Sequence, residues 1–220
     1  MIKDMDKRNY QRELDALILA QQGYRPSVLL QSCCGPCSSS VLEYLTKYFR
    51  VTLLWYNPNL YPAEEFEKRL ATQKELLEKM PLSSNVDVLI ESWKHEEFVS
   101  AVAGYEEEPE GGKRCEQCFY LRLKKCAQMA KEYHFDYFCS TLTVSRYKNA
   151  PLINAIGERI AEETGIKWLP SDFKKKGGEM RSAELAEKYQ LYRQVYCGCE
   201  YSLKQRMEFE ENRNSSCSDE

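Results

Sequence analysis

Cysteine is the residue type through which this chain can do the most chemistry. Ten of its 220 residues are cysteines, and seven of them fall into three short groups. The groups are Cys33, Cys34 and Cys37; Cys115 and Cys118; and Cys197 and Cys199. In a reducing compartment, cysteines clustered in this way indicate metal binding or redox chemistry rather than a structural disulfide framework. We expect Cys126 and Cys139 to be buried small apolar residues, and Cys217 to lie in the C-terminal tail.

Two of the groups have the spacing of metal-ligand pairs. Cys34 and Cys37, and likewise Cys115 and Cys118, are separated by two residues, and at a turn or helix start this gap places both sulfurs on one side. Four such thiols satisfy structural zinc. They equally satisfy an iron–sulfur cluster, which needs the same number of ligands and adds redox function. Zinc leaves Cys33 and the third group unexplained, whereas a cluster beside a second redox-active element accommodates all three groups.

The sequence Cys197-Gly198-Cys199 is open to two interpretations. A disulfide across one intervening residue closes a small, strained ring, and strained disulfides are oxidising and labile. The pair would then be the second redox-active element. Alternatively, the two thiols are further metal ligands. A thioredoxin-like dithiol in the CGPC sequence that ends at Cys37 is a weaker interpretation, because such a dithiol needs no other thiol groups.

Short apolar runs alternate with helical patterns along the chain. We expect strands at 27–32, 51–56, 85–91, 135–142 and 166–170, and helices at 8–22, 38–48, 63–80, 94–105, 115–134, 150–165 and 182–190. This alternation predicts an α/β fold with a mainly parallel sheet flanked by helices. Ligands of such sheets bind at the carboxyl ends of the strands. The cysteine turn that follows the first strand lies at that edge.

The totals limit the class of protein. A length of 220 residues fits one domain, and we divide it into an N-terminal helical extension (1–26), an α/β domain (27–202) and a tail (203–220) that we expect to be disordered. The net charge of -3 excludes a protein that coats nucleic acid non-specifically, but it permits a local basic patch. No apolar run approaches the roughly 20 residues that span a bilayer. The charged N-terminus has no apolar stretch behind it, which predicts a cytoplasmic protein.

Six motifs follow one another along the chain: CCGPC (33–37), YNPNLYPAEEFEKR (56–69), GGKRCEQCFYLRL (111–123), STLTVSRYKN (140–149), FKKKGG (173–178) and LYRQVYCGCEYS (191–202). As an ordered set they resemble the QueH family of cobalamin-independent epoxyqueuosine reductases. The resemblance implies a Rossmann-like (HUP-type) fold. It also implies the last step of queuosine biosynthesis, in which the epoxide of epoxyqueuosine at the wobble position of tRNA is reduced to an alkene.

The resemblance further implies a role for each cysteine group. The ligands of a 4Fe–4S cluster correspond to Cys33, Cys34, Cys115 and Cys118. Cys197 and Cys199 correspond to a redox-active pair that forms a disulfide. Cys37 corresponds to a position beside a second, adjacent iron. That position is Asp in some relatives, and because sulfur is a softer ligand than a carboxylate, the identity of the second metal is open.

The resemblance implies tRNA and an unidentified electron donor as partners. We expect a basic rim that binds the anticodon loop, formed by Lys113, Arg114, Arg146, Lys148, Lys174, Lys175, Lys176 and Arg193. Tyr56, Tyr192 and Tyr196 are candidate proton donors, with a packing role as the alternative. Two other functions remain open: a zinc-stabilised tRNA-binding protein without turnover, and a cytosolic thiol–disulfide reductase that works without iron.

Overall fold

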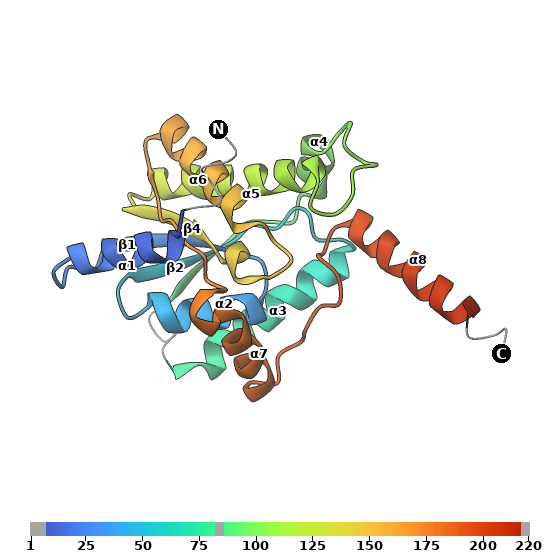
Figure 1. The fold of residues 1–220 in the computed structure, drawn as a ribbon, viewed down its shortest axis with the longest axis horizontal. Coiled ribbons are helices and arrows are strands. Elements are labelled where there is room, and N and C mark those ends of the chain that lie inside the picture. Colours follow the sequence, from blue (N-terminus) through green and yellow to red (C-terminus); the bar gives the residue numbers. More distant parts are fainter. Residues whose placement is uncertain (1–7, 82–85, 217–220) are drawn as a thin grey trace.

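A single parallel sheet forms the centre of the structure, a computed structural model that describes residues 8–81 and 86–216 (Figure 1). Its strands are β1 (Ser27–Ser32), β2 (Arg50–Trp55), β3 (Asp87–Ile90), β4 (Tyr137–Ser140) and β5 (Lys167–Trp168). They run in the order β3-β2-β1-β4-β5, and every neighbouring pair is parallel. The predicted α/β fold with a parallel, Rossmann-like sheet is thus confirmed. The strand order reverses at β1, and such a reversal is where open α/β sheets bind ligands.

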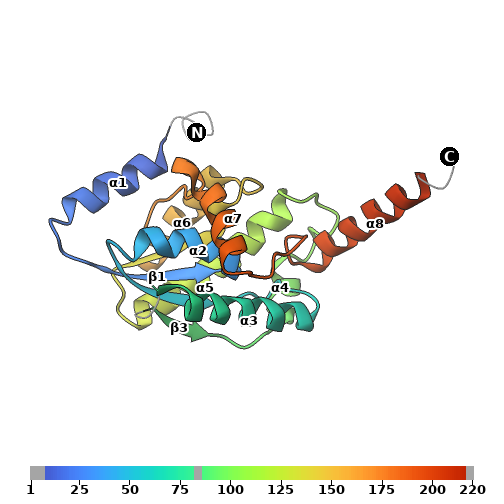
Figure 2. The same ribbon diagram turned by 90° about the horizontal axis from the view of Figure 1, so that it is seen from below.

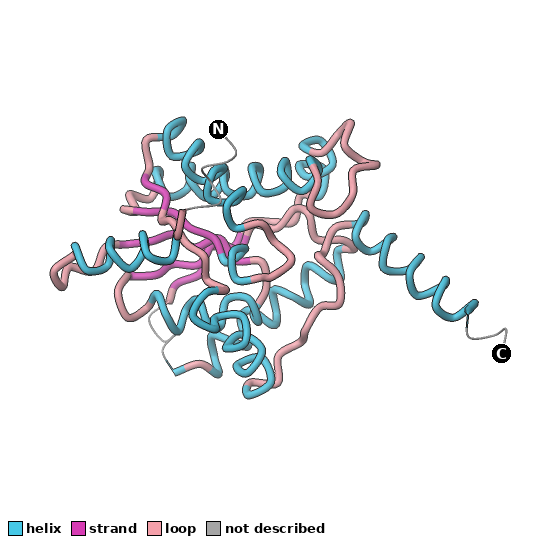
Figure 3. The backbone as a smooth tube through the Cα atoms, in the orientation of Figure 1, coloured by secondary structure: helices cyan, strands magenta, loops and turns pink. Residues whose placement is uncertain are grey.

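Helices cover both faces of the sheet (Figures 1 and 3), with α5 and α6 on one face and α2, α3 and α7 on the other. The helices are α1 (Tyr10–Ala20), α2 (Gly35–Leu45), α3 (Ala63–Lys79), α4 (His95–Ala101), α5 (Lys113–Glu132), α6 (Ala150–Thr164), α7 (Gly178–Lys188) and α8 (Glu200–Ser216). Two short 3-10 helices are η3 (Thr141–Val144) and η4 (Lys175–Gly177). Within the described ranges, none of these helices combines the length and the apolar character that crossing a membrane requires.

Strand β1 is buried on both of its faces, which explains its nearly continuous apolar sequence. Val28 and Leu30 contribute to the core on the side of α2, whereas Leu29 contributes to the core on the side of α5 and α6. Helix α1 adds Leu14 to the first of these cores. The N-terminal helix therefore packs against the body of the fold.

Helix α8 differs from the expectation. The polar C-terminal segment was predicted to be disordered, but Glu200–Ser216 is helical and extends away from the body (Figure 2). Ion pairs one helical turn apart, Lys204–Glu208 and Arg206–Glu210, stabilise it locally. Residues 217–220, and with them Cys217, lie outside the described residues.

Candidate metal and redox site

Three cysteine thiols meet where β1 ends and α2 begins. The sulfurs of Cys33, Cys34 and Cys37 all lie within 4.8 Å of one another, and those of Cys33 and Cys34 are 3.9 Å apart. This is the only such group of three potential metal ligands among the residues that the structure describes. The sequence placed this turn at the carboxyl edge of the sheet, and the structure confirms that position.

The local sequence forces the three thiols together. Cys34 has an extended backbone and caps α2, because its sulfur accepts a hydrogen bond from the backbone N–H of Cys37 at 3.3 Å. Pro36 lies in the first turn of α2, where its missing N–H costs nothing. A Cβ on Gly35 would lie 2.8 Å from the carbonyl oxygen of Thr72, so only glycine lets the start of α2 approach α3 so closely.

The close approach of the three thiols shifts their pKa values in different directions. Hydrogen bonding with Cys34 and Cys37, together with the charge of Arg122, holds the pKa of Cys33 well below its usual value. Hydrogen bonding with Cys33 and Cys34, together with burial, raises the pKa of Cys37 well above its usual value. Burial raises the pKa of Cys34 to about 12. The group therefore favours a thiolate at Cys33 over one at Cys34 or Cys37, and metal binding to all three thiols would release their protons.

A buried cation lies beside the thiols. Arg122, on α5, is 3% exposed and donates from Nη2 to Oδ1 of Asn57 at 2.8 Å. Its Nε has no hydrogen-bond partner among the described residues. A buried guanidinium with an unused donor needs a nearby negative charge. The arrangement therefore fits an anionic metal–thiolate group in the adjacent space, and soft thiolate ligands suit iron–sulfur clusters and zinc.

The second cysteine pair lies on the first turns of α5. Cys115 accepts a hydrogen bond from the backbone N–H of Gly111 at 3.2 Å, and burial raises its pKa. Cys118 is buried, which raises its pKa to about 12, and it packs in one apolar cluster with Cys199. The structure thus joins the second cysteine group to the third. It does not include either residue of the pair in the tight group at β1.

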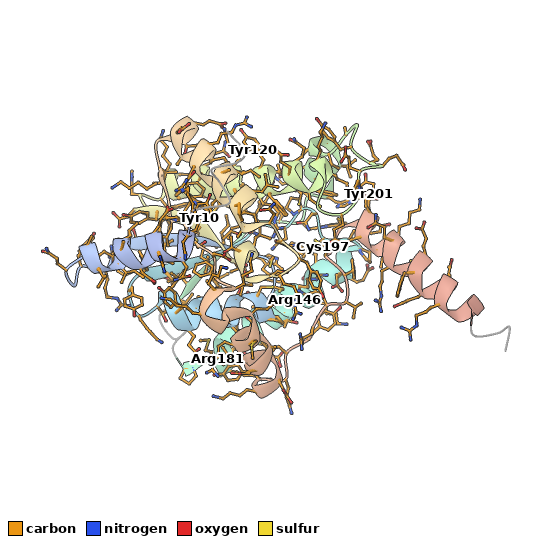
Figure 4. The ribbon with its side chains drawn as sticks, viewed as in Figure 1. Tyr10, Tyr120, Arg146, Arg181, Cys197 and Tyr201 are labelled. Atoms are coloured by element: carbon orange, nitrogen blue, oxygen red, sulfur yellow. The ribbon has the colours of Figure 1, made fainter. Side chains whose placement is uncertain are left out.

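Two side chains, those of Lys148 and Gln194, connect the loop of the third cysteine group to the first cysteine group. The ammonium of Lys148 donates to the sulfur of Cys197 at 3.1 Å. Burial would lower the pKa of Lys148, but the charges of Cys197 and Cys33 outweigh it and raise that pKa. Gln194, in the same loop as Cys197, donates to the sulfur of Cys34 at 3.1 Å. Three segments remote in sequence therefore converge at this end of the sheet, and Figure 4 labels Cys197 there, beside the start of α8.

Cys197 and Cys199 are free thiols in the structure. The disulfide expected from the resemblance is therefore not present, and the described cysteines form no disulfide with one another. Gly198 between them has φ +125°, and a Cβ there would lie 2.5 Å from Leu60 and 2.9 Å from Arg69. Only glycine fits this turn, because it tolerates the backbone angle and leaves room for both neighbours.

A buried ion pair on α3 holds this turn in place. Arg69 is 2% exposed and donates to Glu65 at 2.6 Å. It also donates to the backbone carbonyls of Cys197 at 3.1 Å and Tyr196 at 3.3 Å. The hydroxyl of Tyr192 donates to the same Glu65 carboxylate. Sequence reasoning missed this pair, because its residues lie in a helix rich in Glu and Lys that resembles a solvated face.

Replacing Arg69 with methionine is expected to lower the free energy of unfolding by about 3–5 kcal/mol, because a buried carboxylate at Glu65 is left without its partner. Arg159 and Glu163 form a pair with the same spacing on an exposed face, so Arg159→Met is the matched control and should cost less than about 1 kcal/mol. Anaerobic urea unfolding followed by circular dichroism measures both. Equal losses for the two variants would show that the buried pair stabilises nothing beyond an ordinary surface pair.

A cavity of about 680 Å³ opens above the thiols. Cys33, Cys37 and Cys197 line it, so one space receives sulfurs from two of the three cysteine groups. Its cationic lining residues are Arg69, Arg122, Arg146, Lys148 and Arg193, and its carboxylates are Glu110 and Glu179. The cavity is thus more basic than the chain as a whole, whose net charge is -3.

The predicted basic rim is only partly found. Arg146, Lys148 and Arg193 line the cavity. Arg114 is instead buried and donates to the backbone carbonyls of Glu106 and Glu108, so it organises a loop. The lysines of the run 174–176 have different partners: Lys174 pairs with Asp172, whereas Lys176 pairs with Asp15 on α1.

The three candidate proton-donating tyrosines already donate their hydroxyl hydrogens to protein acceptors. Tyr56 donates to Glu97, Tyr192 to Glu65, and Tyr196 to the carbonyl of Tyr61. Burial is the largest cause that raises the pKa of each, to about 12 for Tyr196. Only Tyr196 lines the cavity. The packing alternative therefore accounts for Tyr56 and Tyr192.

Comparison with known proteins identifies the family. A family model described as Epoxyqueuosine reductase QueH matches residues 28–205. A protein of that name from Streptococcus pyogenes serotype M1 is 42% identical over 202 residues, which cover 90% of this chain and 79% of that protein. Namesakes from Staphylococcus epidermidis and Thermotoga maritima are 38% and 35% identical, over 93% and 83% of this chain and 89% and 93% of their own lengths. This chain, with its cysteine-lined cavity at the carboxyl edge of a parallel sheet, therefore belongs to the QueH family of epoxyqueuosine reductases and is an oxidoreductase.

Proposed function

We propose that this chain reduces the epoxide of epoxyqueuosine to the alkene of queuosine at the wobble position of tRNA, the last step of queuosine biosynthesis. The substrate follows from the name that its relatives share. One observation carries the proposal. Of the three thiols that lie within 4.8 Å of one another, those of Cys33 and Cys37 border the same basic cavity as Cys197, so metal ligands and a reducing thiol would meet one substrate.

The cofactor we propose is a 4Fe–4S cluster held by Cys33, Cys34, Cys115 and Cys118. Cys37 lines the cavity, and we assign it to a second iron beside the cluster. When bound, such a group supplies electrons one at a time and offers an electrophilic metal site. The unused Nε of buried Arg122 supports an anionic group here, because a cation without a full set of partners favours one.

The thiols of Cys197 and Cys199 fit the overall balance of the reaction. Conversion of an epoxide to an alkene and water takes up two electrons and two protons. Two thiols that form one disulfide release two electrons and two protons. Lys148 holds a proton at the sulfur of Cys197, on the wall of the cavity. An external electron donor, which we leave unassigned, would then return the pair to two thiols.

The test is anaerobic purification of the whole chain, with iron and sulfide quantification, visible absorbance and nucleoside analysis. We expect about four irons and four sulfides per chain, further iron beyond these, and a brown colour that a reducing agent bleaches. Incubation with dithionite and tRNA that carries epoxyqueuosine should yield queuosine in the digested tRNA. Queuosine should not form after the iron is removed with a chelator.

The two alternatives give different results in the same experiment. A zinc-stabilised tRNA-binding protein would be colourless, would contain zinc and would yield no queuosine. A thiol–disulfide reductase would turn over a disulfide substrate with no iron present. Full conversion of epoxyqueuosine by a colourless, iron-free chain would refute the proposed cofactor while leaving the family intact.

A further inference from the structure

Exposed apolar side chains gather at the opening of the cysteine-lined cavity. Tyr147, Met180 and Val195 all line it, although they are 80%, 71% and 68% exposed. They come from three separate segments: the loop after η3, helix α7 and the loop before Cys197. Side chains that both line a cavity and remain exposed lie at its mouth, and apolar residues collected in such a place mark an interaction site.

The charges at the same opening favour an anionic partner. Arg146 and Arg193 line the cavity, and the guanidinium of Arg146 lies 5.8 Å from the centre of the Tyr147 ring. Arg146 also pairs with Glu179 at 2.6 Å, which keeps its position defined. A ring flanked by cations is the arrangement by which proteins bind single-stranded nucleic acid, with bases stacked on the ring and phosphates beside the cations.

Hydrogen bonds of the two residues that follow Tyr147 hold this segment beside the sulfur of Cys197. The next residue, Lys148, donates to the sulfur of Cys197, and its carbonyl accepts a hydrogen bond from Lys174 at 3.2 Å. One residue further, Asn149 caps α6 by accepting from the N–H of Leu152. The segment is thus anchored on the inner side of Tyr147. Its ring stands at the mouth, while the neighbouring lysine reaches a sulfur on the wall.

We propose that Tyr147 is the stacking platform for a nucleobase of the anticodon loop next to the modified nucleoside, which itself enters the cavity. The inference rests on the proposed function and assigns it a further substrate-binding residue. A cavity of about 680 Å³ falls in the size range of small-molecule sites, so it suits one nucleoside rather than a folded loop. The neighbouring base must then be bound outside, where Tyr147 is the most exposed aromatic residue of the cavity lining.

The test compares Tyr147→Ala and Tyr147→Phe with Tyr133→Ala. Tyr133 is 54% exposed but lines a different cavity, beside Arg25 and Arg50, and is the matched control. Fluorescence anisotropy with a labelled anticodon stem-loop RNA measures affinity, and steady-state turnover of epoxyqueuosine tRNA separates KM from kcat. We expect Tyr147→Ala to weaken RNA binding by about 10- to 100-fold, with the loss in KM rather than in kcat. Tyr147→Phe and Tyr133→Ala should bind like the unmodified chain.

Unchanged affinity in Tyr147→Ala would overturn the inference, and so would an equal loss in Tyr147→Phe, because the ring would then not be the binding element. Either result leaves the proposed function standing if the unmodified chain still converts the tRNA. Failure of the unmodified chain to bind the stem-loop or to form queuosine would instead refute the proposed function. Iron content of Tyr147→Ala equal to that of the unmodified chain confirms that the variant is folded and loaded.

Discussion

Cys34→Ser is expected to lose bound iron and to reduce turnover by on the order of 10²-fold or more. Cys34 is buried within the three-thiol group, and loss of a direct ligand should exceed the 10- to 100-fold cost of changing a residue that only supports one. Serine is a preferred helix cap, so the hydroxyl can still accept the N–H of Cys37 that the sulfur accepts now. The start of α2 should therefore survive. Anaerobic iron quantification, visible absorbance and turnover of epoxyqueuosine tRNA measure the outcome.

The matched control for this variant is Cys126→Ala. Cys126 is equally buried, but it lies in an apolar core, and its sulfur contacts the backbone carbonyls of Leu29 and Cys139 rather than other thiols. Alanine there should cost about 1 kcal/mol of unfolding free energy and leave iron content and absorbance unchanged. A Cys34→Ser chain that binds as much iron as the unmodified chain and turns over at the same rate would exclude Cys34 as a ligand.

The sequence was sufficient to predict the fold and the position of the first thiols. Strands buried on both faces give apolar runs such as 27–32, and helices between them require a parallel sheet. The turn that carries Cys33 and Cys34 then has to lie at the carboxyl edge. The helix expected at 38–48 is α2, which begins three residues earlier, at Gly35. These features are local or follow from connectivity, so no knowledge of distant contacts was needed.

The parts that sequence reasoning missed depend on distant contacts. Glu65 and Arg69 have the pattern of exposed charges, yet they are buried, and the loop at 191–199 lies against them and accepts two hydrogen bonds from Arg69. Arg114 looked like part of a basic rim, yet it is turned into the loop that precedes its own helix. Whether each of these charged side chains can be buried depends on a partner far away in sequence or on the conformation of a loop. The local amino-acid composition gives no information on either.

Helix α8 shows the opposite error. Low apolar content predicted disorder, because such a segment cannot form a core. Its Glu, Lys, Arg, Gln and Met residues are nevertheless good helix formers, and ion pairs such as Arg206–Glu210 add local support. The helix is also fixed at its start, where Glu200 accepts a hydrogen bond from His95 at 3.2 Å and Cys199 is buried. A segment without a core can therefore be helical when its first turn is anchored.

Cys197→Ser and Cys199→Ser are each expected to keep the iron and to lose turnover by about 10²-fold or more, because a two-electron thiol donor needs both sulfurs. The double variant should lose no more than either single variant, since residues that act as one unit are not additive. Serine at 197 can still accept the hydrogen bond from Lys148, and the carbonyl that Arg69 holds is unchanged. Iron quantification and turnover of epoxyqueuosine tRNA measure the three variants side by side.

A single-turnover reaction separates the redox pair from the alternative of two further metal ligands. The unmodified chain, reduced and then freed of reductant, should form one disulfide between Cys197 and Cys199 per queuosine produced, which non-reducing digestion and mass spectrometry detect. The remaining thiols serve as internal controls, among them Cys139, which is buried beside Ser171. Loss of iron from either serine variant, with no disulfide in the unmodified chain, would assign the pair to the metal instead. The redox role requires the turn at Gly198 to let the sulfurs of Cys197 and Cys199 approach each other, and the amount of disulfide formed in this experiment measures that approach directly.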